Sequence, residues 1–138
     1  MLSTLDISAS GLTAERIRME ITAENIANID TTRTSDGGPY RRKLAVFQEV
    51  LDKKISQNQL IGKGVRVSHI VEDRSAPIKV YDPLHPHAAG DGFVLMPNIN
   101  LADEMVDLIT ASRAYGANVT VLNATKAMAL KALSIGKE

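Results

Sequence analysis

A long segment near the end of the chain, residues 100–136, reads NLADEMVDLITASRAYGANVTVLNATKAMALKALSIG and contains no proline. Asn100 is a favourable N-cap residue, and Gly136 is a plausible helix stop. Acidic residues lie in the first turns and lysines near the end, an order that complements the helix dipole. The segment therefore predicts a single helix, which at 1.5 Å per residue is on the order of 50 Å long.

The apolar residues of this predicted helix follow two stripes. The first stripe is a heptad seam interrupted by Ser112 and Lys126, and the second lies on another side of the later half. The seam comprises Leu101, Met105, Leu108, Tyr115, Val119, Leu122 and Leu133, and the second stripe comprises Ala114, Val121, Met128 and Ile135. A helix that is apolar on two sides needs more than one neighbour.

Residues 1–29 predict a second helical arm, which is also free of proline. Its apolar residues again form two stripes, one of Leu5, Leu12, Met19 and Ile26 and the other of Ile7, Ala14, Ile17 and Ile21. If the two arms packed only against each other, the second stripe of each would stay exposed. We therefore expect both arms to contact other subunits, through heterologous contacts that propagate into rings or helical filaments.

Residues 30–99 form a middle region that contains all five prolines, six of the nine glycines and four of the five aromatic residues. Strands are predicted from short apolar runs at 40–47, 65–71, 78–81 and 93–96. Residues 48–59 are compatible with a short helix. The predicted fold is mainly α with a small β-containing middle, divided into an N-terminal arm (1–29), this middle region (30–99) and a C-terminal long helix (100–138).

The composition of the 138 residues excludes several classes of protein. The absence of Cys excludes a disulfide scaffold, a cysteine-ligated zinc site, an iron–sulfur cluster and a thiol nucleophile. Sixteen Lys and Arg residues balance sixteen Asp and Glu residues, whereas a nucleic-acid-binding protein usually carries excess positive charge. The N-terminus has no signal-peptide pattern, and no stretch approaches the roughly 20 apolar residues of a membrane span. We expect no cofactor, nucleic acid, small-molecule substrate or membrane span.

The sharpest enzymatic motif is DPLHPH at residues 82–87, which is followed by Asp91. Two histidines and two carboxylates this close together could bind a divalent metal, but the sequence offers no evident third ligand or general base. The prolines within the motif and the glycines after it make a turn between two strands the simpler explanation.

Two further motifs carry little chemical information. GKG at residues 62–64 lacks the spacing of a phosphate-binding loop, so a hairpin is the better interpretation. The basic run Arg41, Arg42, Lys43 in a neutral chain favours a solvated or partner-facing strand edge over a nucleic-acid site. The sequence contains no catalytic constellation, and we predict that the chain is not an enzyme.

Three segments share their order and spacing with one known family. They are SASGLTA at 8–14 with Arg18 and ENIAN at 24–28; VYDP at 80–83 with His85, Pro86, Ala88, GFV at 92–94 and MPNIN at 96–100; and EM at 104–105 with Ile109, ASRAY at 111–115, ANV at 117–119 and Asn123. This pattern resembles the bacterial flagellar basal-body rod proteins, and among them those of the proximal rod. Gly116 and His87 depart from it, and a mid-helix glycine costs roughly 1 kcal/mol relative to Ala, which predicts a local weak point.

The resemblance implies a structural subunit of the rod, the drive shaft that crosses the periplasm and transmits torque from motor to hook. It implies that the N- and C-terminal helices pair as a coiled coil and that the extended subunit forms part of a helical tube. The implied partners are other copies of the chain, other rod proteins and the flagellar type III export apparatus, which exports its substrates without a cleaved signal peptide. The implied location is the flagellar basal body.

The expected assembly interface combines apolar positions on both arms with two asparagines of the ENIAN segment. These residues are Leu5, Ile7, Leu12, Met19, Ile21, Asn25, Ile26, Asn28, Met105, Leu108, Tyr115, Val119, Leu122 and Met128. The alternative function is a cytosolic helical adaptor or chaperone that binds an amphipathic partner through the same stripes. The location of the protein in the cell separates the two hypotheses.

Overall fold

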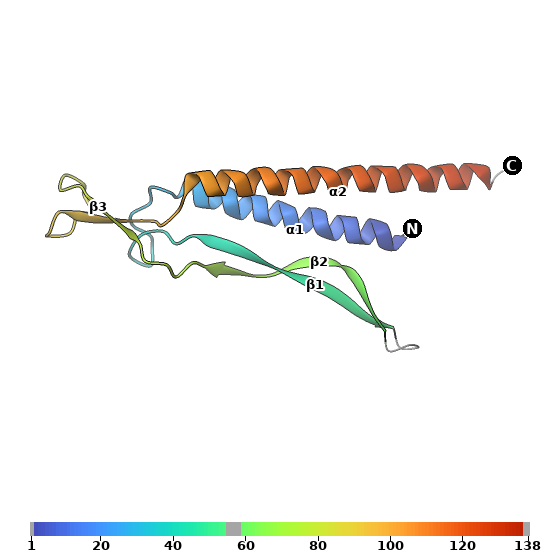
Figure 1. Ribbon diagram of the computed structural model, residues 1–138, viewed down its shortest axis with the longest axis horizontal. Coiled ribbons are helices and arrows are strands. Elements are labelled where there is room, and N and C mark those ends of the chain that lie inside the picture. Colours follow the sequence, from blue (N-terminus) through green and yellow to red (C-terminus); the bar gives the residue numbers. More distant parts are fainter. Residues whose placement is uncertain (1, 55–58, 137–138) are drawn as a thin grey trace.

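Two long helices flank a middle region of antiparallel strands in the computed structural model, which describes residues 2–54 and 59–136 (Figure 1). The described elements are α1 (Leu2–Ala27), β1 (Lys43–Lys54), β2 (Gln59–Glu72), β3 (Ile78–Tyr81), β4 (Phe93–Met96) and α2 (Leu101–Ile135). β1 pairs with β2, and β3 pairs with β4, as two separate antiparallel hairpins. The prediction of two terminal helices around a small β-containing middle is confirmed.

The ends of α2 lie where the sequence predicts them. The Asn100 side chain accepts a hydrogen bond from the Ala102 amide at 3.0 Å, and the Gly136 amide donates to the Ala132 carbonyl at 3.2 Å. These contacts satisfy backbone groups that a helix end otherwise leaves unpaired. The helix continues through Gly116 without interruption, so the expected weak point produces no break (Figure 1).

α1 is the middle layer of the molecule. It runs antiparallel to α2 on one side, and the β1–β2 hairpin lies along its other side (Figure 1). Ala14 and Ile21, which belong to one of the two predicted stripes of this arm, are buried. Contacts within the single chain therefore account for the two apolar sides of α1, because α2 packs on one side and the β1–β2 hairpin packs on the other.

The hairpin approaches α1 closely at Gly64. This residue has a φ of +115°, and a Cβ atom on it would lie 2.1 Å from Ser10 Oγ, so no other residue fits without displacement. The Ser10 hydroxyl donates to the Ile7 carbonyl at 2.7 Å and accepts from the Val65 amide at 3.1 Å. Ser10 thereby holds β2 against the N-terminal half of α1.

The strand predictions are confirmed at β3 and β4 and are only partly right elsewhere. The strand predicted at 40–47 begins at Lys43, so residues 40–42 precede it, and the strand predicted at 65–71 extends over Gln59–Glu72. Residues 78–81 and 93–96 are strands as predicted, with Ile78 opposite Met96. The short helix considered for residues 48–59 is wrong in the described part, because β1 continues through Lys54 and places Gln48 opposite Arg66. Residues 55–58 lie outside the described part. Long-range pairing with β2 overrides a weak local preference here.

The chain is too extended to bury its apolar residues alone. Its accessible surface area is 9824 Å², whereas a compact monomer of 14.9 kDa exposes about 7,000 Å². The distal end of α2 projects beyond the N-terminal end of α1 (Figure 1). None of the described helices combines the length and the hydropathy that crossing a membrane requires.

Candidate assembly surface and the polar network beneath it

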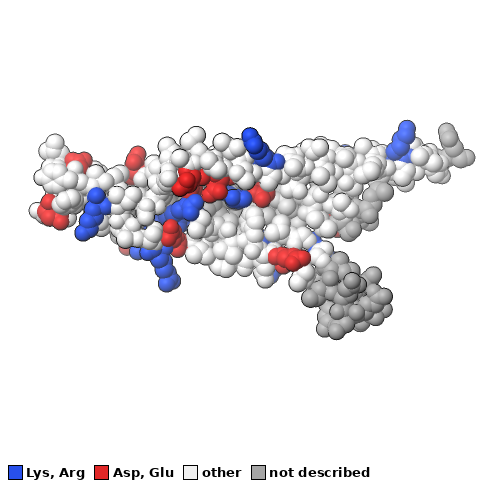
Figure 2. All heavy atoms as spheres, viewed as in Figure 1, with Lys and Arg blue, Asp and Glu red and all other residues white. Residues whose placement is uncertain are grey.

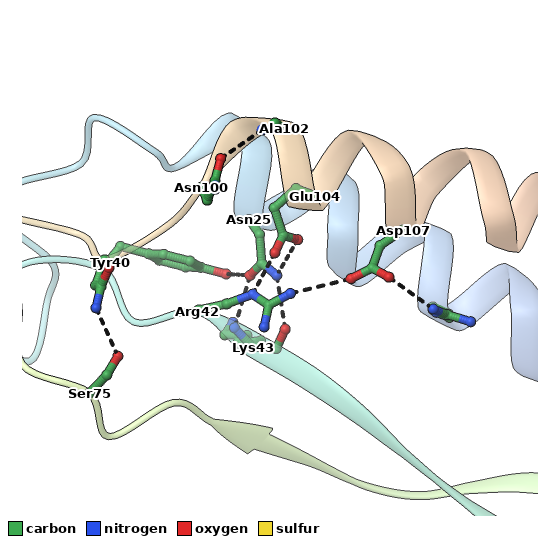
Figure 3. A network of polar contacts seen from close by, with 11 residues as sticks. Asn25, Tyr40, Arg42, Lys43, Ser75, Asn100, Ala102, Glu104 and Asp107 are labelled. Atoms are coloured by element: carbon green, nitrogen blue, oxygen red, sulfur yellow. Dashed lines mark hydrogen bonds and ion pairs between the residues drawn. The ribbon is translucent and has the colours of Figure 1, made fainter.

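Asn25 joins three segments of the chain at the C-terminal end of α1 (Figure 3). Its Nδ2 donates to the Lys43 carbonyl at 2.8 Å and to Glu104 Oε2 at 3.0 Å. Its Oδ1 accepts from the Lys43 amide at 2.9 Å and from the Tyr40 hydroxyl at 3.1 Å. An amide side chain has two donors and two favourable acceptor positions, so the Asn25 side chain is fully satisfied.

Glu104 brings a negative charge into the same buried place. Asn25 and Glu104 are each only 1% exposed, and Arg42 Nε donates to Glu104 Oε1 at 2.5 Å. Asp107, one turn further along α2, accepts from Arg42 at 3.3 Å and from Arg18 at 3.1 Å (Figure 3). A buried carboxylate requires charged and hydrogen-bonding partners, and those of Glu104 and Asp107 come from different segments. The ion pairs therefore connect α1, the segment before β1 and the first turns of α2.

Tyr40 and Lys43 complete this network. Lys43 Nζ donates to Glu24 Oε1 at 2.6 Å and lies 5.6 Å from the centroid of the Tyr40 ring. Burial, followed by the charges of Glu24, Glu72 and Glu104, raises the pKa of Tyr40 to about 12. The Tyr40 hydroxyl is therefore protonated at physiological pH and remains a donor to Asn25.

The structure corrects the interpretation of the basic run at residues 41–43. Arg41 is exposed, but Arg42 and Lys43 are half-buried and paired with carboxylates of α1 and α2. Sequence reasoning missed this network because Asn25 and Glu104 are 79 positions apart. Local sequence patterns do not reveal a partner so far away. The one available signal is that Glu104 is a charged residue within an apolar heptad pattern.

α2 presents one face to α1 and leaves the opposite face free within the single chain. Glu104, Ala111 and Thr125 are buried, and the half-buried Leu108 and Leu122 lie on the same side of the helix. The rest of the helix surface carries exposed apolar residues, which we call the outer face of α2: Met105, Val106, Ile109, Val121, Met128, Leu130, Leu133 and Ile135. Exposed apolar residues in this number are characteristic of an interaction surface.

The residues predicted for assembly fall into three groups by burial. Ile21 and Asn25 are buried within the single chain, and Ile7, Met105 and Met128 are exposed. The remaining nine are half-buried: Leu5, Leu12, Met19, Ile26, Asn28, Leu108, Tyr115, Val119 and Leu122. The structure thus separates positions that build the subunit from positions that are open to a neighbour.

The DPLHPH segment forms a turn between β3 and β4. Asp82 Oδ1 accepts from the Leu84 amide at 3.2 Å, and His85 Nδ1 accepts from the His87 amide at 3.1 Å. His87 Nδ1 is bonded to Thr32 Oγ1 at 2.8 Å. Among the described residues, no three His, Cys, Asp or Glu side chains lie close enough together to hold a metal ion. These side chains stabilise the turn and the loop beside it.

Comparison with known proteins identifies the family. The family described as Flagella basal body rod protein matches residues 5–33, and the family described as Flagellar basal body rod FlgEFG protein C-terminal matches residues 91–135. The two matches therefore cover most of α1 and all of α2.

Full-length relatives extend these matches. The flagellar basal-body rod protein FlgC of Bacillus subtilis (strain 168) is 46% identical, and the alignment covers 97% of each chain. The FlgC protein of Borreliella burgdorferi is 45% identical over 98% of this chain and 97% of its own, and that of Salmonella typhimurium is 40% identical over 99% and 98%. These comparisons do not support the adaptor or chaperone alternative. The chain belongs to the FlgC family of flagellar basal-body rod proteins, and it is a structural rod subunit and not an enzyme.

Proposed function

We propose that this chain is a subunit of the proximal rod, crosses the periplasm as part of the drive shaft, and assembles with its neighbours through its two terminal helices. The outer face of α2 carries the proposal. It exposes large apolar residues in two groups, at 105–109 and at 121–135, and α1 already occupies the opposite side. Burial of this face in neighbouring subunits would remove the excess surface of the extended chain.

Coiled-coil pairing of the two helices is part of this proposal. The positions of α2 that are buried or half-buried on the side of α1 recur at alternating steps of four and three residues: Glu104, Leu108, Ala111, Tyr115, Asn118, Leu122 and Thr125. That spacing is the heptad spacing of coiled coils. Its polar members, above all Glu104, favour one register over the others because each needs a specific partner.

The predicted interface residues take two different roles in the proposed assembly. Ile21 and Asn25 act within the subunit, because they fix α1 against the hairpin and α2. Met105 and Met128 on the outer face, together with Ile7 on α1, contact neighbouring subunits. Contacts in more than one direction suit a shaft that transmits torque, since neighbours are then held both along and around the axis.

The proposed partners are other copies of this chain, other rod proteins and, during export, the flagellar type III apparatus. Two properties support them. The sequence contains no Cys, so no disulfide opposes unfolding for export. Equal numbers of acidic and basic residues avoid the mutual repulsion that a large net charge would create among closely packed copies.

Fractionation of cells tests the proposed function. A strain that lacks its own rod protein of this family is complemented with the chain, and basal bodies are purified from the swimming cells. We expect the chain in the basal-body fraction. A chain that stays in the cytosol and leaves the cells non-motile contradicts the proposal.

A substitution on the outer face gives a sharper test. Val106→Asp combined with Ile109→Asp places two charges on exposed positions of α2, so the isolated subunit keeps its helical circular dichroism. Burial of unpaired charges between subunits is costly, and we expect loss of motility and loss of the chain from basal bodies. Asn123→Asp, at another exposed position of α2, is the control for the effect of an added charge on the isolated subunit, whose helical circular dichroism it should also leave unchanged. Normal swimming of the double variant would rule out this face as an interface.

A further inference from the structure

The most exposed large apolar side chains lie at the two opposite ends of the molecule. Leu84 is 94% and Tyr81 is 66% exposed at the β3–β4 turn, and Leu133 is 67% and Ile135 is 68% exposed at the distal end of α2. Within the part of the chain that the structure describes, no other large apolar residue is as exposed as these four. Figure 1 places the turn at one end of the long axis and the end of α2 at the other.

Leu84 lies in a turn whose backbone is held by several hydrogen bonds. Besides the bond from its own amide to Asp82, the Asp82 carbonyl accepts from the His85 amide at 3.3 Å, and the His85 carbonyl accepts from the Ala88 amide at 3.0 Å. The residues before and after it in this turn include Pro83 and Pro86, whose rings fix φ. A turn whose backbone is already fixed loses little backbone entropy when a partner covers its apolar side chain.

Tyr81 is fixed beside this turn. Its ring lies edge to face with Phe93, with 5.3 Å between the ring centroids. Gly92 has a φ of +78°, and a Cβ atom on it would lie 2.9 Å from the Tyr81 ring, so glycine is required for this ring position. Tyr81 and Leu84 together form a small apolar surface, which we call the turn patch.

The net charges around the two ends differ in sign. Asp82 and Asp91 are exposed in the turn and outnumber the exposed Lys79 of β3, whereas Lys126 and Lys131 are exposed near the end of α2. On the face drawn in Figure 2, the outermost part of the β3–β4 end carries acidic atoms with one group of basic atoms behind them, whereas the described charged atoms over the distal end of α2 are basic. Contact between two turns would bring carboxylates together, and contact between two α2 ends would bring ammonium groups together, so charge favours the mixed contact.

We propose that the turn patch of one subunit packs against the distal end of α2 of a second copy, with Leu84 and Tyr81 on Leu133 and Ile135. The inference rests on the proposed function, because it specifies one contact of the assembled subunits. The contact is heterologous, so it joins copies head to tail and repeats along a filament without closing. The carboxylates of Asp82 and Asp91 then lie near Lys126 and Lys131 of the next copy.

Engineered disulfides test the contact, since the natural chain contains no Cys. Leu84→Cys and Leu133→Cys are introduced into separate full-length proteins, which are mixed at high concentration and oxidised. We expect the mixed dimer to exceed either homodimer several-fold. The double variant L84C/L133C should give a ladder of oligomers, because each copy then offers both halves of the contact. Equal amounts of all three dimers, or a dominant L84C homodimer, overturn the proposal.

Two controls separate this contact from random collision. Val106 is 62% exposed on α2 but lies far from the distal end of the helix. Val106→Cys should therefore not cross-link to L84C above the homodimer level. Asp82→Asn with Asp91→Asn keeps a side-chain acceptor for each turn and removes both charges. We expect cross-linking between L84C and L133C to fall with added salt. When the L84C protein also carries D82N and D91N, its cross-linking to L133C should be lower and should not depend on salt. Cross-linking between L84C and L133C that does not respond to salt contradicts the charge complementarity.

Cross-linking in assembled basal bodies distinguishes failure of this contact from failure of the proposed function. If L84C/L133C protein is present in basal bodies but forms no link between copies, the contact is wrong and the proposed rod subunit stands. If the protein is absent from basal bodies while the unmodified chain is present, the substitutions disturb assembly at these ends, and the mixed L84C and L133C dimer in solution then decides whether the contact joins two copies. If neither protein reaches basal bodies, the proposed function fails.

Discussion

Asn25 is the residue on which the internal arrangement of the subunit depends most directly. Its amide connects the backbone of Lys43 to Tyr40 and Glu104, and all of its hydrogen-bonding groups are used. Asn25→Asp has nearly the same shape but removes the donors and places a second negative charge beside buried Glu104. We expect a loss of roughly 3 kcal/mol in the free energy of unfolding, measured by urea denaturation at neutral pH.

A matched control separates this effect from a general effect of adding acid to a helix. Asn123→Asp adds the same charge at an exposed position of α2, and we expect it to change stability by less than about 0.5 kcal/mol. Equal stability of the Asn25 and Asn123 variants would show that the network contributes little. If Asn25→Asp prevents folding altogether, the loss of helical circular dichroism relative to the control reports the same effect.

Tyr40 makes the stability of the subunit depend on pH in the alkaline range. Its pKa in the folded chain is about 12, against an ordinary value of 10.0, so the folded chain retains a proton that the unfolded chain releases. The corresponding stability is complete below pH 10 and is lost as pH rises from about 10 to about 12. Phenolate absorbance should show a late titration step, and Tyr40→Phe should remove that step. Persistence of the late step in Tyr40→Phe would disprove the assignment, with Tyr81→Phe as the exposed control.

Single residues with a local role could be predicted from the sequence, and residues with a distant partner could not. Asn100 and Gly136 act on the backbone next to them, so their residue types alone predict the ends of α2. The partner of Asn25 lies 79 positions away, and that of Arg42 lies 62 positions away. The basic run at 41–43 therefore resembled an ordinary charged strand edge, although Arg42 neutralises a buried carboxylate.

At the scale of the helix, the heptad pattern of α2 is informative but ambiguous by one position. The row with Leu108 and Leu122 does lie on the side of α1. The second row of the predicted seam contains Met105, but the structure turns the neighbouring Glu104 toward α1 and leaves Met105 exposed. Apolar character alone favours the row of Met105 over the row of Glu104 as the one that faces α1. That choice is wrong, because the apolar Met105 is exposed and the charged Glu104 is buried and paired. Ser112 and Lys126, which interrupt the predicted row, are the signal of this offset.

Two adjacent residues of α2 distinguish its two faces. Leu122 is half-buried on the side of α1, whereas Val121 is exposed on the outer face. We expect Leu122→Asp to destabilise the isolated subunit by roughly 2–4 kcal/mol, because a charge is placed in the helix interface. Val121→Asp should leave the urea midpoint unchanged but reduce incorporation into basal bodies. Similar destabilisation by both substitutions would contradict the assignment of the faces.

At the scale of the whole molecule, the exposed surface and the shape have one explanation. About 2,800 Å² of accessible surface exceeds that expected for a compact monomer of this mass, and much of the exposed apolar part lies on the outer face of α2. Sequence patterns predict this excess, since two stripes on each arm exceed what one hairpin of helices covers. They do not predict that the β1–β2 hairpin covers one side of α1, because the packing of a hairpin on a helix is set by tertiary contacts and not by local propensity.

Local stability should therefore decrease along α2 in the free subunit and become uniform on assembly. The first turns of α2 are held by the Asn25–Glu104–Arg42 network, the central turns pack on α1, and the distal end projects beyond α1 without a described partner in the single chain (Figure 1). Opening free energies fall toward zero where few buried contacts hold a helix. Hydrogen exchange of the dilute subunit should show slow amides near residue 104 and fast amides in residues 128–135. The same distal amides should become protected in purified basal bodies, because neighbouring subunits then cover Leu133 and Ile135. Uniformly slow exchange along α2 in the free subunit would mean that the helix needs no neighbour, and fast distal exchange in the assembled rod would mean that no neighbour covers it.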